Sequence, residues 1–416
     1  MLKRVTALSL PARGKMGLDP ETLKVAGDIL ADVENHGEAA VRRYAERFGE
    51  LSSTDPLLLG PEALAAAREE LPKEDRDVLE RVAERVRFFA AAQKETLSAL
   101  DVAIEGGRAG HSWSPMERAG CYAPGGRFPL PSSVLMTAVT ARVAGVEHVL
   151  VASPRPTAVT LAAASVAGAD GLLAVGGAHA IGALAYGAGP FDAVDVIVGP
   201  GSRWVTAAKK LVSGQVAIDM IAGPSELVVL ADGYADASTI AADLLAQAEH
   251  DDDAIPILVS DSPALIDAVE QELATQLETL PTADTARNAL ANGYAVRTHS
   301  VDEGVAVCDT LAPEHLQVMT ADAEQVAGQL RHYGGLFVGS VSAEVFGDYG
   351  AGPNHVLPTG GTARLTGGLS VVDFMRVRTW LNVDRAAAET LAADSAHLAR
   401  LEGLEAHARA AEARKR

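Results

Sequence analysis

Glutamate and histidine stand side by side at Glu314-His315, just after Pro313 and ahead of an apolar, strand-like run. Because histidine titrates near neutral pH and a carboxylate can orient it or a water molecule, such a pair can act as a general base. Neighbouring acidic and histidine residues are also common as solvated surface pairs. The pair by itself leaves both interpretations open.

Gln247 and His250 lie three residues apart in a predicted helix, so their side chains share one face. Nitrogen and oxygen ligands of this kind suit zinc, although manganese could compete, and Asp348 with a further histidine could complete the site. Each residue also has a structural interpretation, since His250 could face a helix C-terminus and Asp348 could cap a turn. The spacing indicates a divalent-metal site without requiring one.

Glu402 and His407 form a third acid–histidine combination, near the end of the chain. Five residues apart, they lie about 140° around a helix, so they could meet one ligand only at the edge of a shared face or where the helix ends. Two exposed residues on an acidic helix are the simpler interpretation of this spacing.

Composition and charge narrow the class of protein. The chain has 416 residues, 48% of them hydrophobic and 4% aromatic, which is typical of a soluble α/β or helical enzyme with two or three domains. A formal net charge of −20 argues against nucleic-acid partners. Cys121 and Cys308 are too far apart in sequence for a thiolate metal knot, and no apolar run is long enough to span a membrane. We expect a cytoplasmic protein.

Short apolar runs alternate with helical patterns after a Gly- and Pro-rich loop at residues 120–127, which suggests a domain boundary. This alternation predicts right-handed βαβ units and a parallel sheet, with ligands at the carboxyl ends of the strands. The expected helices are 131–144, 158–167, 178–188 and 202–213, and the expected strands are 148–152, 172–175, 194–198 and 226–231. The turns at 176–177 and 199–201 are rich in glycine, but neither matches the dinucleotide fingerprint.

A second α/β unit is predicted after residue 231. Its helices are expected at 237–249 and 263–277 and its strands at 255–259 and 335–339. The first hundred residues predict helices at 20–48, 61–70 and 73–98, which form a scaffold without chemistry of their own. From residue 370 the chain is predicted to return to helix, and its amphipathic tail could pack on a second subunit.

Six runs of sequence together resemble histidinol dehydrogenase, in the order and at the spacing of that family. They are residues 120–126 (GCYAPGG), 218–226 (IDMIAGPSE), 247–250 (QAEH), 313–316 (PEHL), 347–349 (GDY) and 354–359 (NHVLPT). The resemblance extends from about residue 30 to the end of the chain. It implies a zinc- and NAD-dependent homodimer that oxidises L-histidinol to L-histidine through an enzyme-held aldehyde, in the last steps of histidine biosynthesis.

Site residues follow from the resemblance by position. His315 would be the base that takes the alcohol proton, and Glu314 would help to activate water for the second oxidation. The implied ligands of one zinc ion per subunit are Gln247, His250, Asp348 and His407, the last from the partner subunit. The implied substrate contacts are Ser225, Gln247, His250, His315, Asp348, His355, Glu402 and His407.

The resemblance also implies a fold of two Rossmann-like parallel-sheet domains with degenerate cofactor loops, plus small helical N- and C-terminal segments. The expected division is an N-terminal segment (1–17), a discontinuous α/β domain with the metal and catalytic residues (18–121 and 227–369), a cofactor-side α/β domain (122–226) and a helical tail on the partner subunit (370–416).

The expected cofactor contacts are Tyr122, His179 and Ser202, and two of them depart from the family. The family has glutamine where His179 stands and asparagine where Ser202 stands, whereas Tyr122 is retained. Histidine and serine can still donate hydrogen bonds to a dinucleotide. Packing of Tyr122 beneath its loop is an equally good interpretation of that ring.

Three functions remain open on this sequence. The first is histidinol dehydrogenase, and the second is a relative that oxidises another small polyol, such as a sulfonated propanediol. Glu402, placed for a cationic imidazole or ammonium, favours histidinol, whereas the changed cofactor contacts lean towards the relative. The third is a non-catalytic α/β binding protein, against which the intact Glu314-His315 pair argues.

Overall fold

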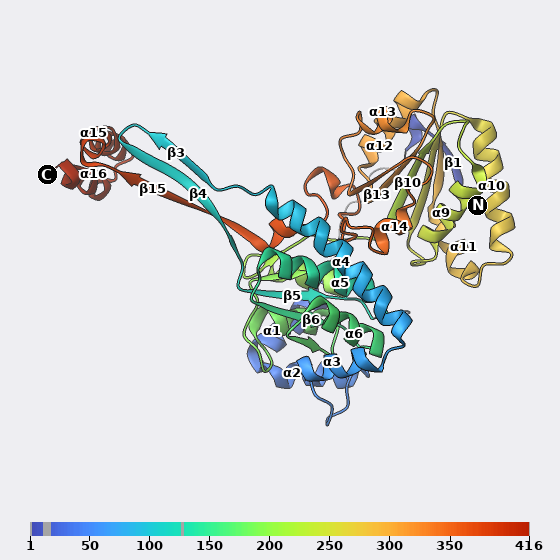
Figure 1. Ribbon diagram of the computed structural model, residues 1–416, viewed down its shortest axis with the longest axis horizontal. Coiled ribbons are helices and arrows are strands. Elements are labelled where there is room, and N and C mark those ends of the chain that lie inside the picture. Colours follow the sequence, from blue (N-terminus) through green and yellow to red (C-terminus); the bar gives the residue numbers. More distant parts are fainter. Residues whose placement is uncertain (1, 11–17, 126–128, 416) are drawn as a thin grey trace.

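Two α/β units and a projecting arm make up the chain (Figure 1). The computed structural model describes residues 2–10, 18–125 and 129–415. Residues 11–17 of the expected N-terminal segment and Gly126 of the glycine-rich loop therefore lie outside the described residues. Both units are built on mainly parallel sheets, which confirms the predicted fold class. No helix in the described ranges is both long enough and apolar enough to cross a membrane.

Sheet A, in the unit at the right of Figure 1, has the strand order β1-β12-β11-β10-β13-β14 with every pairing parallel. Its strands are β1 (Lys3–Thr6), β10 (Glu226–Ala231), β11 (Ile255–Ser260), β12 (Tyr294–Arg297), β13 (His315–Met319) and β14 (Gly335–Val338). One face packs against α9 (Ala237–Ala248), α10 (Pro263–Leu277) and α11 (Ala283–Asn292), and the other against α12 (Val301–Leu311) and α13 (Ala323–Ala327). Alternate residues of β10 enter the two cores, which explains its uninterrupted apolar sequence.

Sheet B has the order β2-β7-β6-β5-β8-β9 and is parallel except for the β2–β7 pair. Its strands are β2 (Leu58–Leu59), β5 (Arg118–Tyr122), β6 (His148–Ala152), β7 (Gly171–Leu173), β8 (Val196–Val198) and β9 (Ala217–Ile218). The helices that follow the strands are α5 (Pro131–Ala144), α6 (Ala158–Ala167), α7 (Gly177–Tyr186) and α8 (Arg203–Val212). The predicted alternation over residues 131–231 is therefore confirmed to within about two residues at each boundary.

The N-terminal helices belong with sheet B, contrary to the expected division of the chain. They are α1 (Pro20–His36), α2 (Glu38–Arg47), α3 (Pro61–Glu70) and α4 (Lys73–Glu95). The first two share a core with α7 and α8, and the last two share the opposite core with α5 and α6. Residues 18–121 are thus not part of the unit formed by 227–369. Sheet B needs these helices because its own four leave apolar surface on both faces.

Glycine divides the helix expected over residues 20–48. Gly37 has φ = 57°, a left-handed conformation that few other residues adopt, and its N–H caps the last turn of α1. α1 itself begins where Asp19 accepts a hydrogen bond of 2.8 Å from the N–H of Thr22.

An antiparallel arm carries the C-terminus away from both units (Figure 1). Its three-stranded sheet C has the order β15-β4-β3, made of β3 (Leu100–Ile104), β4 (Gly107–Pro115) and β15 (Met375–Val383). α15 (Arg385–Leu401) and α16 (Glu405–Glu412) lie at its far end. The prediction of helix from residue 370 onward is wrong for 375–383. Alternating apolar residues such as Val377 and Leu381 favour a strand there, and β4 supplies the partner.

Candidate active site

Glu314 and His315 are buried at the start of β13, with 6% and 4% of their surfaces exposed. α12 ends just before them at Leu311, and the next residue, Ala312, is a non-glycine residue with φ = 49°. This left-handed residue turns the chain sharply into Pro313 and delivers both side chains to the amino edge of sheet A. A solvated surface pair is therefore excluded.

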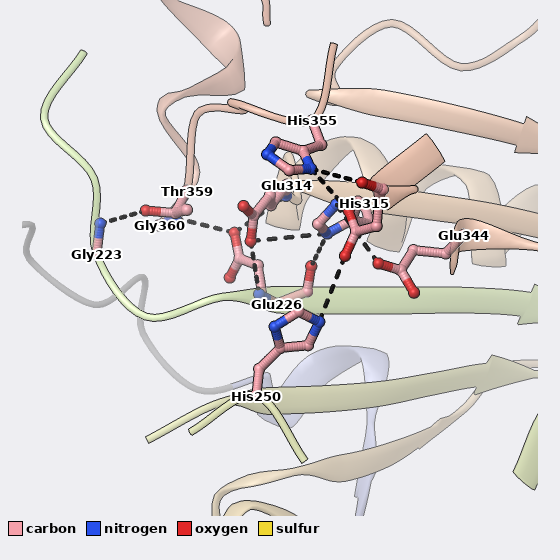
Figure 2. A network of polar contacts seen from close by, with 10 residues as sticks. Gly223, Glu226, His250, Glu314, His315, Glu344, His355, Thr359 and Gly360 are labelled. Atoms are coloured by element: carbon pink, nitrogen blue, oxygen red, sulfur yellow. Dashed lines mark hydrogen bonds and ion pairs between the residues drawn. The ribbon is translucent and has the colours of Figure 1, made fainter. Parts of the chain in front are cut away.

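Glu226, at the start of the neighbouring strand β10, holds the pair in place (Figure 2). Its N–H donates to a Glu314 carboxylate oxygen at 2.9 Å, and its own carboxylate accepts from the N–H groups of Glu314 at 3.3 Å and Gly360 at 2.9 Å. The main-chain oxygen of Glu226 lies 3.2 Å from His315 Nδ1. That contact favours the proton on Nδ1, which leaves Nε2 as the atom able to accept a proton.

His250, Glu344 and Asp348 form a candidate metal centre beside His315. One ligand atom of each lies within 4.8 Å of the others. His250 follows α9, whereas Glu344 and Asp348 begin and end α14 (Glu344–Asp348), which packs against α9. His250 Nε2 is 3.4 Å from Asp348 Oδ2, and His315 Nε2 is 3.6 Å from Asp348 Oδ1.

Two unpartnered buried side chains show that this centre fits a metal ion. Gln247, fully buried near the end of α9, has no hydrogen-bond partner among the described residues for either amide atom. Glu344 is fully buried too, and both of its carboxylate oxygens lack a partner among the same residues. Burial of such groups is costly unless a ligand engages them. The cluster of one imidazole and two carboxylates suits a divalent cation such as zinc, and the unpartnered amide of Gln247, three residues before His250, is available as a further oxygen donor.

The electrostatics of the cluster reflect crowded carboxylates. Burial raises the pKa of Glu314 to about 7, and burial together with the charge of Asp348 raises the pKa of Glu344 to about 8. Burial alone would lower the pKa of His315, but the nearby carboxylates outweigh it and raise this pKa to about 10. Hydrogen bonds with His250 and His315 overcome burial and hold the pKa of Asp348 below its usual range. A cation bound beside these carboxylates would offset their negative charge and lower the pKa of His315, which would free its Nε2 to accept a proton near neutral pH.

His355 joins the two α/β units at the site. Its Nδ1 lies 2.8 Å from the main-chain oxygen of Asp348, and its Nε2 lies 3.3 Å from the hydroxyl of Ser133 in the first turn of α5. Gly223 and Thr359, on either side of the same boundary, are also hydrogen-bonded, and Ser225 lies half-buried just before Glu226. A ligand at His355 would therefore contact both units.

The buried cluster around Glu314 and His315 lies at the amino edge of sheet A. Glu226 and His315 are the first residues of their strands. In sheet B the Gly-rich turns at 176–177 and 199–201 follow β7 and β8, at the carboxyl ends where a parallel sheet is expected to bind a ligand. The two α/β units therefore present opposite strand ends to the site.

Glu402 and His407 are not brought to this cluster within one chain. Both are exposed, Glu402 at the end of α15 and His407 within α16, and these helices lie at the tip of the arm (Figure 1). Apolar side chains remain exposed along the same arm. They are Leu100, Val102, Ile104, Val377, Trp380, Leu381, Leu391, Leu398, Leu401 and Leu404.

The three expected cofactor residues have different surroundings at the carboxyl edge of sheet B. Tyr122 is 4% exposed, and its hydroxyl accepts a hydrogen bond of 3.2 Å from the N–H of Gly177. His179 is 1% exposed and faces inward. Ser202 is exposed at the N-terminus of α8, and its side chain makes no capping hydrogen bond. Of the three side chains, Ser202 is the one open to a ligand.

Gly199 allows the turn after β8 to approach Tyr122. It has φ = 113°, and a Cβ atom there would lie 2.0 Å from the main-chain oxygen of Tyr122. Gly199→Ala is therefore expected to cost about 3 kcal/mol of stability, from backbone strain and the clash together. Gly214→Ala is the matched control, because its φ is 105° but nothing lies within 4 Å of the added Cβ. We expect a cost of about 1 kcal/mol for the control, measured by calorimetric unfolding. Equal losses for the two variants would contradict the close contact.

Two residues of the site were not singled out from the sequence. Glu226 ends the run 218–226, but nothing in its spacing indicated that it orients Glu314. Glu344 precedes Asp348 by four residues, so helical spacing could have indicated a shared face. Its carboxylate lies 3.7 Å from His315 Nε2.

Comparison with known proteins agrees with this arrangement. A family profile described as histidinol dehydrogenase matches residues 14–415. A histidinol dehydrogenase of Thermus thermophilus is 45% identical over 405 residues, covering 97% of each chain. One of Bordetella parapertussis is 43% identical over 417 residues, covering 98% of this chain and 94% of the relative. The crystal structure of histidinol dehydrogenase from Elizabethkingia anophelis superimposes with a TM-score of 0.89 at 30% identity, covering 99% of this chain and 94% of that one.

The matched region includes every residue of the buried cluster and both helices of the arm. Since profile, sequence relatives and solved structure agree over nearly the full length, this chain belongs to the histidinol dehydrogenase family.

Proposed function

We propose that this chain oxidises L-histidinol to L-histidine in two NAD-linked steps through histidinaldehyde, with one zinc ion per subunit. The observation that carries the proposal is the buried Glu314-His315 pair beside His250 and Asp348. Together the steps consume one water molecule and reduce two NAD molecules. We expect such a biosynthetic enzyme in the cytoplasm.

His315 is proposed as the base of the first oxidation. Its Nδ1 is held by the main-chain oxygen of Glu226, so its Nε2 faces the cluster and can take the hydroxyl proton as the hydride leaves for NAD. Asp348 and Glu344, 3.6 and 3.7 Å from Nε2, stabilise the imidazolium that forms. Burial excludes competing water from this proton transfer.

Glu314 is proposed to act in the second oxidation. One of its carboxylate oxygens already accepts from the N–H of Glu226, which fixes the side chain but leaves acceptor capacity for a water molecule. As an ionised carboxylate it can take a proton from that water as the water adds to the aldehyde carbon. The hydrate anion so formed would lose a hydride to a second NAD molecule and become a carboxylic acid, which loses its proton to solvent and leaves as the carboxylate of histidine.

Gln247, His250, Asp348 and His407 of the partner subunit are proposed to hold the zinc ion. Bound zinc would supply Lewis-acid polarisation and a fixed anchor for the substrate. The unpartnered amide of Gln247 supports its inclusion. Ser225, His355 and the partner subunit's Glu402 would complete the substrate contacts, and a carboxylate suits a cationic imidazole or ammonium.

A homodimer is proposed because two proposed site residues on the arm, His407 and Glu402, do not reach the metal centre of their own chain. His407 and Glu402 are exposed at the tip of an arm whose apolar side chains are also exposed, including Leu381 at 66% and Leu401 at 72%. An apolar surface of this kind is typical of an interaction site. If the arm crosses to a second copy, it covers that surface and completes the partner's metal centre.

Removal of the metal tests this proposal. We expect the purified protein to form NADH with L-histidinol, a chelator to abolish NADH formation, and added zinc to restore it, because Gln247, His250 and Asp348 provide too few contacts to position the substrate alone. The assay is absorbance of NADH with measured zinc content.

Oxidation of a panel of alcohols, measured with NAD and with NADP at a defined zinc concentration, distinguishes histidinol dehydrogenase from a polyol dehydrogenase and from a non-catalytic binding protein. Oxidation of a sulfonated propanediol without oxidation of histidinol would contradict the proposed function and support a polyol dehydrogenase. If the protein bound no metal and oxidised no alcohol, the result would favour a non-catalytic binding protein. The comparisons with known proteins favour the histidinol enzyme over both alternatives.

A further inference from the structure

His179 and Glu50 form a buried pair at the edge of sheet B. His179 Nε2 lies 2.9 Å from Glu50 Oε2, and their side chains are 1% and 8% exposed. The rings of Tyr44 and Phe48 flank the imidazole, with centroids 5.8 and 5.6 Å away. The pair is thus flanked by Tyr44 in α2 and by the segment that joins α2 to β2. In this arrangement the imidazole faces Glu50 and the aromatic rings.

The Glu50 carboxylate also binds the turn that begins α7. The same Oε2 atom accepts a hydrogen bond of 3.2 Å from the N–H of Gly176. The next N–H, that of Gly177, donates to the Tyr122 hydroxyl. Free N–H groups at a helix N-terminus commonly bind phosphate, but here a built-in carboxylate and a phenol use two of them. Glu50 therefore ties together His179, the Gly176–Gly177 turn and, through that turn, Tyr122.

Close packing makes the position of this turn sensitive to its supports. Gly177 has φ = 61°, and a Cβ atom at Gly176 would lie 2.7 Å from the Pro154 side chain. Among the described residues, His179 Nδ1 has no hydrogen-bond partner, so Glu50 provides the polar contact that orients the ring. Without Glu50, the Gly176 N–H and both imidazole nitrogens would be buried with no partner.

We propose that Glu50 is a positioning residue for the nicotinamide cofactor, acting through His179 and the Gly176 N–H to fix the turn beside Tyr122. The inference rests on the proposed function, because it takes NAD as the ligand of this edge. It assigns the histidine at position 179 a role different from direct contact: the residue fixes the shape of the turn, and Glu50 is its partner.

Binding of NAD to the zinc-loaded, full-length protein tests the inference. We expect Glu50→Ala to weaken NAD binding about tenfold in calorimetry and to raise the KM for NAD equally, because a small displacement of a binding turn is enough for such a loss. The kcat at saturating NAD and the KM for histidinol are expected to change less than about twofold. Glu50→Gln keeps an acceptor oxygen for both N–H groups and should restore most of the affinity.

A double-mutant cycle tests the pairing itself. Because Glu50 acts through His179, Glu50→Ala and His179→Ala should be clearly non-additive for NAD affinity. His299→Ala and Glu303→Ala remove an exposed His–Glu contact of 2.8 Å in the other unit and should leave NAD binding unchanged. Additive losses, or equal damage from Glu50→Gln and Glu50→Ala, would overturn the inference.

The outcomes also separate this inference from the proposed function. A wild-type protein that binds NAD but does not oxidise histidinol would contradict the proposed function and leave the role of Glu50 standing if the cycle behaves as expected. A wild-type protein that oxidises histidinol, with NAD binding unaffected by Glu50→Ala, would reject only the role of Glu50. Absence of NAD binding in the wild type would reject both.

Discussion

His315→Ala is expected to lower kcat for histidinol oxidation about 10²–10⁴-fold, the usual contribution of a positioned general base. The imidazole is buried at the start of β13, its Nδ1 is held by Glu226, and its Nε2 lies 3.6 Å from Asp348. Among the described residues, His315 Nε2 has no hydrogen-bond partner. The nearby His355 differs, because its Nε2 is hydrogen-bonded to the hydroxyl of Ser133. Steady-state NADH formation with both substrates saturating measures the loss.

Zinc content distinguishes a lost base from a lost metal site. We expect His315→Ala to keep one zinc per subunit, because the proposed ligands Gln247, His250 and Asp348 are untouched. His299→Ala, which removes an exposed imidazole, is the control and should retain full activity. Loss of metal from the His315 variant, measured by atomic absorption, would contradict its role as base, and activity near that of the wild type would exclude His315 from the chemistry.

Periodicity accounted for the fold within each unit but not for the assignment of helices to sheets. Strand β10 was predicted over its full length because both faces of a central parallel strand are buried, which produces an apolar run that periodicity detects. The helices at 20–95 were predicted too, yet an amphipathic face does not specify which sheet covers it. The arm was missed for a related reason, since β15 pairs with β4 across more than 250 residues of sequence.

Some residues of the site could be predicted from the sequence and others could not. His250 lies near Asp348, as the spacing predicts. However, α9 ends at Ala248, so His250 lies two residues beyond the helix whose face it is expected to share with Gln247. Glu226 became visible only in the structure, because its main-chain groups hold Glu314 and His315 across a pair of parallel strands. Main-chain hydrogen bonds do not depend on the identity of the side chain, so they cannot be predicted from the residue type.

Nothing in the sequence around His179 indicates that this residue faces inward. A histidine in a Gly-rich turn suggests a ligand contact, but Glu50 lies 129 residues away and no local pattern pairs them. The remaining cofactor assignments depend on the same edge of sheet B, where Ser202 is exposed and Tyr122 is buried. His179 could contact the cofactor directly, or it could support the binding turn together with Glu50. The double-mutant cycle distinguishes these two roles through the additivity of the losses in NAD affinity.

A mixture of two inactive variants is expected to regain activity if the arm completes the partner's site. His407→Ala removes a proposed metal ligand at the tip of the arm, whereas His315→Ala removes the proposed base in the body of the chain. In a hybrid dimer of the two, one site combines an intact His315 with the intact His407 of the other subunit. When equal amounts are unfolded and refolded together, half the dimers are hybrids with one intact site each, so about a quarter of wild-type activity should return.

The recovery depends on which chain supplies His407, and the alternatives give distinct results. If each chain used its own His407, every site in every hybrid would lack either the base or the ligand, and the mixture would stay inactive. Two variants of the body, His315→Ala and His250→Ala, form the matched control, because no hybrid of these contains an intact site. Since His407 and His250 lie on elements that do not meet within one chain, this recovery would establish that the metal centre is built between two subunits.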